Sequence, residues 1–303
     1  MTLRGEGATR KGGMSPLVVA VVGPTAAGKS DLGVALAKEL GGEVVNADSM
    51  QLYRGMDIGT AKLTEAERRD VPHHLLDVWD VRVTATAAAY QELARAVVEQ
   101  ATVPLVFVGG SGLYVRAALD QLEFPGTDPA LRALLEAELE EHGPAALHQR
   151  LRDLDPAAAS RMEPSNGRRV VRALEVVLLT GSMPGAMTEY EPWVPTAYLG
   201  LDRDDLRERV ATRVDRMWGQ GLLDEVAGLD GLREGVTASR ALGYAQALAQ
   251  VDGTMTEAEA KAQTVTATNR FVKRQRAWFR RDPRIRWLEP GGDLLGQALA
   301  VLS

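Results

Sequence analysis

Short apolar runs rich in β-branched residues recur along the chain, separated by stretches with helical periodicity. The first run, residues 17–22, ends at Gly23 and is typical of a strand buried on both faces of a parallel sheet. The pattern predicts further strands at 43–46, 74–78, 104–108 and 196–201, and an edge strand at 284–288. It predicts helices at 31–40, 84–100, 113–119, 204–220, 222–229 and 256–279. Because strands alternate with helices, we expect an α/β fold with a parallel sheet flanked by helices.

The pattern changes after about residue 124. Between 128 and 180 the chain is rich in Ala, Leu, Glu and Arg, and Pro144, Pro156 and Pro164 divide it into short helices. We therefore predict an all-helical insertion domain at 125–195 that interrupts an α/β core formed by 15–124 and 196–303. Residues 1–14 contain Gly and basic residues without the apolar region of a signal peptide, so we expect a flexible leader.

Composition narrows the function classes. The 303 residues are 45% hydrophobic and 25% charged, as is ordinary for a globular protein. The sequence contains no Cys, which excludes disulfides, thiolate metal sites and Cys nucleophiles. No apolar run is long enough for a membrane span, so we expect a cytoplasmic protein without a membrane partner. We also expect the protein to be a monomer. The net charge of −6 means that any nucleic-acid contact must come from a local basic patch.

A phosphate-binding motif follows the first predicted strand. Residues 23–30, GPTAAGKS, fit G-x-x-x-x-G-K-[ST] between a strand and a helix, so the fold should be P-loop NTPase-like. Backbone amides of such a loop surround phosphate oxygens, Lys29 adds a positive charge, and the Ser30 hydroxyl can bind Mg²⁺. The motif leaves the phosphate compound open. The predicted phosphate-binding residues are Gly23, Pro24, Thr25, Ala26, Ala27, Gly28, Lys29 and Ser30.

A kinase would normally also carry a Walker-B Asp at the end of an apolar strand. The strand predicted at 104–108 ends in glycines and carries no Asp. Asp48 and Asp77 could take the Walker-B role, but their positions do not indicate it. This gap weakens a kinase interpretation.

Two polar residues follow predicted strands at the edge where an open α/β sheet binds its ligands. Asp48 follows the second strand and could act as a general base or could cap a following helix, and spacing favours neither. Ser111 follows Gly109 and Gly110 and could contact an anion, although an N-cap role is the more common one.

The C-terminal region supplies a basic patch. Between Arg270 and Arg286 the chain carries many basic residues and a single acid, Asp282, with Trp278 and Phe279 among them. For any one Arg a solvated helix face is as plausible as a contact, but the cluster favours nucleic-acid binding.

Seven blocks together resemble, in order, the signature motifs of the tRNA dimethylallyltransferase (tRNA isopentenyltransferase) family. They are GPTAAGKS (23–30), NADSMQLYRGMDIGTAK (46–62), PHHLLDV (72–78), GGSGLYVRA (109–117), GRRVVRALEV (167–176), SRALGYAQ (239–246) and KRQRAWFRR (273–281). The second block is long and unusual, and the resemblance covers about residues 17 to 288.

The resemblance implies a prenyl-transferring enzyme of tRNA modification. Such enzymes transfer a dimethylallyl group from dimethylallyl diphosphate to N6 of adenosine 37, beside the anticodon of tRNAs that read codons beginning with U. The products are N6-(dimethylallyl)adenosine and diphosphate, and Mg²⁺ assists. The partners are then dimethylallyl diphosphate and the tRNA anticodon stem-loop. The P-loop, often described in this family as an ATP-binding site, would hold the diphosphate instead.

The resemblance also implies residue roles. Asp48 would be the general base, and Ser111, where the family usually has Thr, and Arg213 would be the other catalytic residues. Ser30 would bind the metal. The implied tRNA-contact residues are Asp48, Ser49, Met50, Gln51, Ser111, Arg132, Arg168, Arg169, Val170, Val171, Arg172, Arg240, Ala241, Leu242, Gly243, Tyr244, Ala245, Lys273, Arg274, Gln275, Trp278 and Arg280.

Two alternatives remain open from the motifs alone. One is a small-molecule or nucleoside kinase with a P-loop, and the other is a non-catalytic P-loop protein that binds RNA.

Overall fold

The computed structural model describes residues 16–185 and 189–303, so the predicted leader at 1–14 lies outside the described residues. The described part of the chain divides into a core unit, residues 16–121 and 191–303, and an insert that lies between Leu122 and Tyr190. The insert therefore ends earlier than the predicted limit of 195. The reason is pairing within the core unit: Gln121 N donates to Glu191 O at 2.8 Å, and Trp193 N donates to Leu119 O at 2.8 Å.

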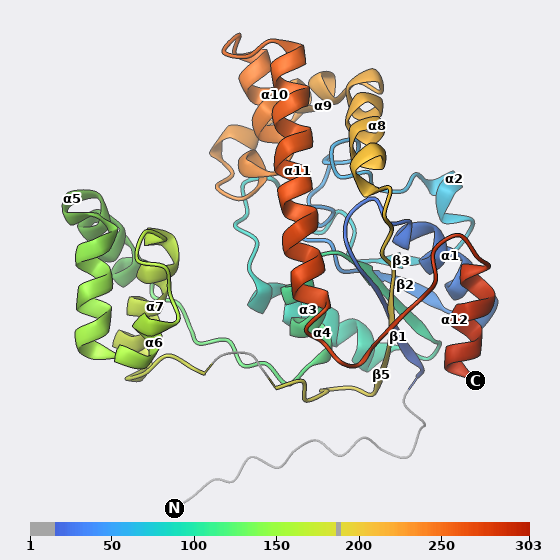
Figure 1. Ribbon diagram of the computed structural model, residues 1–303, viewed down its shortest axis with the longest axis horizontal. Helices are drawn as coiled ribbons and strands as arrows, with labels where there is room; N and C mark the ends of the chain where they lie inside the picture. The colour runs from blue at the N-terminus through green and yellow to red at the C-terminus, as the bar shows by residue number, and fades with distance from the viewer. Residues whose placement is uncertain (1–15, 186–188) are drawn as a thin grey trace, which may run out of the picture. The chain divides into compact units, whose positions relative to one another are not determined.

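The core unit contains the predicted parallel sheet (Figure 1). Its strands are β1 (Val18–Val22), β2 (Glu43–Asn46), β3 (His73–His74), β4 (Leu105–Gly109), β5 (Thr196–Gly200) and β6 (Ile285–Trp287). They form a six-stranded sheet in the order β3-β2-β4-β1-β5-β6, and every neighbouring pair is parallel. The predicted fold class is confirmed. The carboxyl ends of β1, β2, β4 and β5 lie at the same edge of the sheet, and ligands of such folds bind at this edge.

One predicted strand is much shorter than expected. The apolar run 74–78 suggested a full strand, but β3 ends at His74. Leu75 and Asp77 adopt left-handed conformations with φ of 60° and 58°, which an extended strand cannot contain. The chain therefore turns away from the sheet directly after β3.

Helices cover the sheet and continue beyond its edge. They are α1 (Lys29–Leu40), α2 (Glu65–Arg68), α3 (Ala87–Gln100), α4 (Gly112–Leu119), α8 (Leu206–Gly219), α9 (Leu222–Gly228), α10 (Tyr244–Val251), α11 (Glu257–Phe279) and α12 (Leu294–Leu302). The sequence pattern had not predicted α2, α10 and α12. No helix in the described part of the chain is long and apolar enough to cross a membrane.

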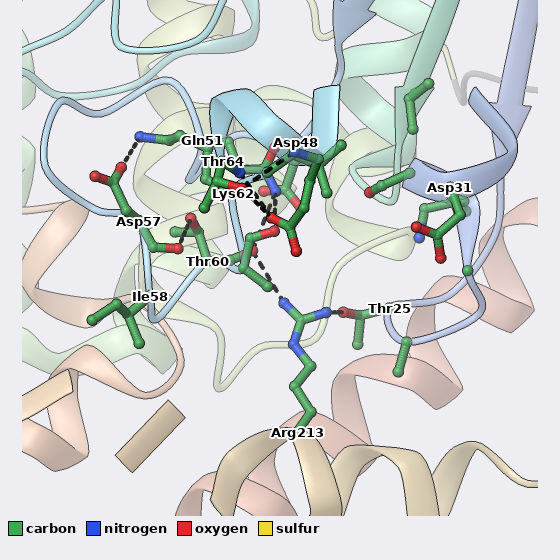
Figure 2. Close-up of a pocket in the computed structure, with 18 of the residues that line it drawn as sticks. Thr25, Asp31, Asp48, Gln51, Asp57, Ile58, Thr60, Lys62, Thr64 and Arg213 are labelled. Carbon is green, nitrogen blue, oxygen red and sulfur yellow. Dashed lines mark hydrogen bonds and ion pairs between the residues drawn. The ribbon is translucent and has the colours of Figure 1, made fainter. Parts of the chain in front are cut away.

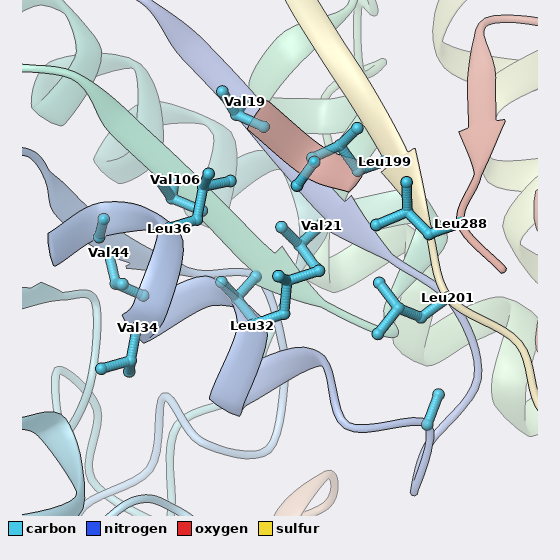
Figure 3. Packing of buried hydrophobic residues seen from close by; sticks show 14 of the residues in the cluster. Val19, Val21, Leu32, Val34, Leu36, Val44, Val106, Leu199, Leu201 and Leu288 are labelled. Carbon is cyan, nitrogen blue, oxygen red and sulfur yellow. The ribbon is translucent and has the colours of Figure 1, made fainter. Parts of the chain in front are cut away.

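The main core lies between the sheet and α1 (Figure 3). Alternate residues of each strand share a face, so Val19 and Val21 of β1 meet Leu32 and Leu36 of α1. Burial of each such side chain contributes about 1.5–3 kcal/mol. This packing holds the start of α1, and the loop before it, against the end of β1.

A second core, formed by α8, α9, α10 and α11, includes Tyr53 and Met56 of the segment 47–62. The longest of these helices, α11, begins with a capping box. The Thr256 hydroxyl accepts from Glu259 N at 3.3 Å, while the Glu259 carboxylate accepts from Thr256 N at 2.8 Å. The segment after β2 is thus packed against the C-terminal helices.

The insert is built from α5 (Pro129–Leu154), α6 (Pro156–Ser160) and α7 (Gly167–Thr180), with a separate hydrophobic core. Pro144 interrupts α5, as its position predicted, and Gly143 before it has a φ of 76°.

Candidate active site

The P-loop begins at a glycine that no other residue could replace without strain. Gly23 has a φ of 141°, and a Cβ there would lie 2.0 Å from the carbonyl oxygen of Leu201. Gly28, with a φ of 96°, stands at the N-cap of α1 and offers no side-chain cap. The first amides of α1 can therefore donate to an anion, assisted by the helix dipole.

Two cationic side chains meet at this loop. Lys29 Nζ donates to the Pro24 carbonyl at 2.7 Å. Burial lowers the pKa of Lys29 to about 8; the Asp48 carboxylate raises this pKa, and Arg213 lowers it. Burial also lowers the pKa of Arg213, against the opposing effect of Asp48. A bound anion would favour the charged form of both groups, so the site is suited to a multiply charged phosphate compound.

Arg213 connects α8 to two loops (Figure 2). Its Nη1 donates to the Thr25 hydroxyl at 3.2 Å, and its Nη2 donates to the Thr60 carbonyl at 3.1 Å. One turn earlier, Arg209 Nε donates to the Ala26 carbonyl at 2.8 Å. Arg209 was not among the predicted site residues, although its spacing from Arg213 on one helix face could have suggested it.

Asp48 lies in a loop held by Asn46. The Asn46 side chain accepts from Asp48 N at 2.9 Å and donates to the carbonyls of Asp48 at 3.0 Å and Leu75 at 2.9 Å. Asp48 Oδ1 accepts from Met50 N at 3.0 Å. No described helix begins here, because α2 starts only at Glu65, so the alternative that Asp48 caps a helix is wrong.

Ser111 occupies the N-cap position of α4, but its hydroxyl makes no capping bond. Instead the hydroxyl accepts from Ser49 N at 3.2 Å and lies 3.3 Å from the Ser49 hydroxyl. This contact joins the loop after β4 to the loop after β2, and it places Ser111 beside Ser49, which directly follows Asp48.

A cavity of about 930 Å³ brings most of these groups together. Thr25, Lys29, Ser30, Asp48 and Arg213 all line it. Apolar side chains also line it, namely Val44, Ile58, Leu63, Leu76, Val108 and Met217. Ser111 is outside this lining. A cationic end with apolar walls suits a small diphosphate ester that has a hydrocarbon tail.

The residues present fit one kind of metal site. Among the described residues there is no group of three His, Asp or Glu side chains that could hold a metal ion by itself. Mg²⁺, however, is commonly held by one or two protein oxygens together with substrate phosphates and water. Ser30 and Asp48 supply such oxygens in the cavity. The possible Walker-B residue Asp77 is engaged elsewhere, since its carboxylate lies 2.5 Å from Lys62 Nζ.

Comparison with known proteins decides the family. The sequence model of the IPP transferase family matches residues 51–282. The chain belongs to the IPP transferase family. The resemblance of the sequence motifs is thereby confirmed.

Family relatives match over almost the whole chain. A tRNA dimethylallyltransferase of Streptomyces coelicolor is 62% identical over 290 residues, which cover 91% of each chain. One of Thermobifida fusca is 59% identical over 304 residues, which cover 94% of each chain. The crystal structure of a tRNA isopentenylpyrophosphate transferase from Bacillus halodurans is 39% identical, with a TM-score of 0.67 and 94% of each chain covered. A eukaryotic dimethylallyltransferase described as acting on tRNA is 25% identical, with a TM-score of 0.73 over 88% of this chain and 70% of the other.

The tRNA contacts implied by the family motifs separate into exposed and buried groups. Lys273 and Arg274 of α11 are exposed, as is Arg280 directly after the helix, and Arg280 lies 3.3 Å from the Asp202 carboxylate. Trp278 is half-buried, and Gln275 is buried, so Gln275 cannot present its amide to solvent. The helix therefore has one basic face and one face turned to the protein.

The segment 240–245 likewise contains both exposed and buried residues. Arg240 is exposed, but Ala241, Gly243 and Tyr244 are buried. The Tyr244 hydroxyl donates to Glu225 at 2.5 Å. Ala241 and Tyr244 therefore do not present their side chains to solvent, and a tRNA contact of this segment stays a prediction. Leu242 and Ala245 are half-buried.

In the segment 47–62, Met50 packs against the second core, while Gln51 lines the cavity and donates to the Thr60 carbonyl at 3.2 Å.

Within the insert, Arg168 and Arg169 are exposed, whereas Val170 and Val171 are buried in the core of the insert. Within this segment the exposed side chains of Arg168 and Arg169 are the ones open to a partner, and the tRNA contact stays a prediction. Arg132 and Arg172 both form ion pairs with the buried carboxylate of Glu175, so these two guanidinium groups are held in place by the insert.

Proposed function

We propose that this protein transfers a dimethylallyl group from dimethylallyl diphosphate to N6 of adenosine 37 in tRNAs that read codons beginning with U. Membership of the IPP transferase family supports a prenyl-transferring enzyme, and relatives about 60% identical are named tRNA dimethylallyltransferase. The observation that carries the proposal is the shared cavity, in which the Asp48 carboxylate and the P-loop cations line one space.

The P-loop side of the cavity stabilises the leaving group. When the allylic C1–O bond breaks, the bonding electrons pass to the diphosphate and positive charge develops on the five-carbon group. In this proposal the diphosphate binds at the P-loop, so that Lys29, Arg213 and the first amides of α1 face the growing negative charge. Bound Mg²⁺, held by Ser30 and the diphosphate oxygens, would add Lewis-acid neutralisation of the same charge.

Asp48 serves the acceptor side. The N6 amine of adenine is a weak nucleophile, because its lone pair is conjugated with the ring. As N6 forms its bond to C1 it becomes positively charged, and Asp48 accepts the proton that it loses. General-base assistance of this kind is worth about 10²–10⁴-fold. Asn46 holds the loop of Asp48, and Ser111 supports the adjoining Ser49, so the base is fixed before the nucleotide arrives.

The nucleotide must leave the anticodon loop to reach Asp48. Flipping a base costs a few kcal/mol and costs least in a single-stranded loop. The exposed cations of α11, Lys273 and Arg274, are suited to contact the phosphates around it.

The test is incubation of the protein with labelled dimethylallyl diphosphate, Mg²⁺ and an unmodified anticodon stem-loop, followed by nucleoside analysis. We expect N6-(dimethylallyl)adenosine with adenosine at position 37 and no product with guanosine there. Asp48→Asn should abolish transfer and keep stem-loop affinity, whereas Glu208→Gln, at an exposed carboxylate of the same cavity, should remain active.

Two results would contradict the proposal. Phosphate release from ATP without prenyl transfer would support the kinase alternative. Stem-loop binding without any transfer would support a non-catalytic RNA-binding protein.

A further inference from the structure

Gln275 of α11 bridges two loops of the candidate active site. The residue is 5% exposed. Its Oε1 accepts from the backbone amide of Thr25 in the P-loop at 2.9 Å. Its Nε2 donates to the carbonyl of Gly110, in the loop that carries Ser111, at 2.9 Å. One buried amide therefore satisfies a donor on the diphosphate side and an acceptor on the Ser111 side.

The glycines of the second loop allow this approach. A Cβ on Gly110 would lie 2.4 Å from Gln275 Nε2, and a Cβ on Gly112 would lie 2.1 Å from Trp278 Nε1. Both glycines are thus needed so that side chains of α11 can pack against the loop. The Gly-rich sequence of this loop thus has a packing role that the sequence analysis did not predict.

The other face of the same helix is exposed and basic. Lys273 and Arg274 directly precede Gln275, and Arg280 caps the C-terminal end of the helix. Under the proposed function these cations contact the tRNA, while Gln275 contacts the P-loop. A small displacement of α11 on tRNA binding would therefore act on Thr25 and Gly110 through a single side chain.

We propose that Gln275 is a positioning residue that couples tRNA binding on α11 to diphosphate binding at the P-loop. This inference rests on the proposed function. Because Gln275 is buried, it acts through Thr25 and the Ser111 loop and touches neither substrate. Coupling between two sites is reciprocal, so the tRNA should strengthen diphosphate binding by the same factor as diphosphate strengthens tRNA binding.

The amide group is specifically suited to this bridge, since it presents one acceptor and one donor. A Glu side chain keeps the acceptor for Thr25 N, but its second carboxylate oxygen cannot donate to the Gly110 carbonyl and repels it. A Met side chain fills a similar volume and makes neither bond. Both variants remove the link to Gly110, and only Met also removes the link to Thr25.

The experiment measures the affinity for inorganic diphosphate by calorimetry, with and without saturating anticodon stem-loop. The proteins are the wild type, Gln275→Met, Gln275→Glu and Gln263→Glu, an exposed glutamine of the same helix that serves as the control. In the wild type and the control we expect the stem-loop to strengthen diphosphate binding about fivefold or more. In both Gln275 variants the factor should fall to near one, with stem-loop affinity in the absence of diphosphate unchanged. Thermal melts identify which variants are folded, and either folded Gln275 variant is sufficient for the comparison.

Three outcomes would overturn the inference: no coupling in the wild type, coupling retained in the Gln275 variants, or a loss of stem-loop affinity alone, which would make Gln275 a tRNA contact. Prenyl transfer measured on the same wild-type sample separates the two proposals. Active wild type with unchanged coupling in the variants refutes only the role of Gln275, whereas inactive wild type refutes the proposed function.

Discussion

The Arg213 guanidinium joins the Thr25 hydroxyl, at 3.2 Å, to the Thr60 carbonyl, at 3.1 Å. One planar group on α8 thus holds the P-loop and the segment after β2 at a fixed separation. Lysine presents a single ammonium on a flexible chain and cannot reproduce two directed bonds from one plane.

Arg213→Lys should therefore reduce the rate of prenyl transfer more than a charge-conserving substitution normally does. We expect kcat to fall about 10²–10³-fold, the usual effect of removing one group that stabilises a developing anion. Single-turnover rates of prenyl transfer provide the measurement. Arg207→Lys, on an exposed position of α8, is the matched control and should keep full activity. Equal rates for Arg213→Lys and the wild type would exclude a role for the guanidinium geometry.

Glu225 holds the segment 57–59, which includes two residues that line the cavity, Asp57 and Ile58. Its carboxylate accepts from the backbone amides of Asp57 at 3.1 Å, Ile58 at 2.7 Å and Gly59 at 3.3 Å, and from the Tyr244 hydroxyl. Thr60, the partner of Arg213, follows directly. The carboxylate therefore sets the position of a wall that the cationic site depends on.

Glu225→Gln leaves at least one of these amides without an acceptor, which costs about 1–3 kcal/mol. We expect a decrease in Tm of roughly 2–8 °C and a higher KM for dimethylallyl diphosphate. Differential scanning calorimetry and steady-state kinetics measure the two effects. Asp224→Asn, at the exposed neighbour, should change neither. A normal KM in the Gln variant would show that the wall is positioned without Glu225.

The contact between Ser111 and Ser49 predicts that the hydroxyl at position 111 is needed and that an added methyl group is tolerated. Ser111→Thr keeps the hydroxyl that accepts from Ser49 N, so transfer should remain within a few-fold of the wild-type rate. Ser111→Ala leaves that amide without its partner, and we expect kcat/KM to fall at least about tenfold, equivalent to roughly 1.4 kcal/mol. Competition assays with dimethylallyl diphosphate give both values. Equal losses in the two variants would mean that packing at this position matters, and not the hydroxyl.

The P-loop could be predicted from the sequence because its signal is local. The spacing of Gly23, Gly28 and Lys29 lies within one turn between a strand and a helix, and the structure has that context. The early end of β3 could not be predicted, since the left-handed conformations of Leu75 and Asp77 leave no compositional trace.

The contacts that connect the site were not foreseen for a different reason: Glu225 was not predicted at all, and Gln275 was predicted only as a tRNA contact. Glu225 meets amides more than a hundred positions away, and Gln275 meets Thr25 and Gly110 at separations of 250 and 165 residues. Such contacts exist only after the helices pack, so no periodic pattern marks them. The buried valines of α7, Val170 and Val171, were assigned to tRNA contact through their motif, although helical periodicity places them on the apolar face.

The exposed face of α11 gives the most direct test of tRNA binding. Lys273→Gln and Arg274→Gln each remove one exposed cation that can contact a phosphate. Stem-loop affinity should then weaken for all loop sequences alike, and the slope of log K against log salt should decrease in magnitude by about 0.7–0.9 per cation removed. Fluorescence anisotropy at several salt concentrations measures this slope. Lys261→Gln, on the same helix but paired with Glu257 at 2.7 Å, is the control and should leave the slope unchanged. Binding releases fewer counterions when one cation–phosphate contact is lost, and the slope reports this number. If Lys273→Gln and Arg274→Gln both keep the wild-type slope, other residues bind the phosphates.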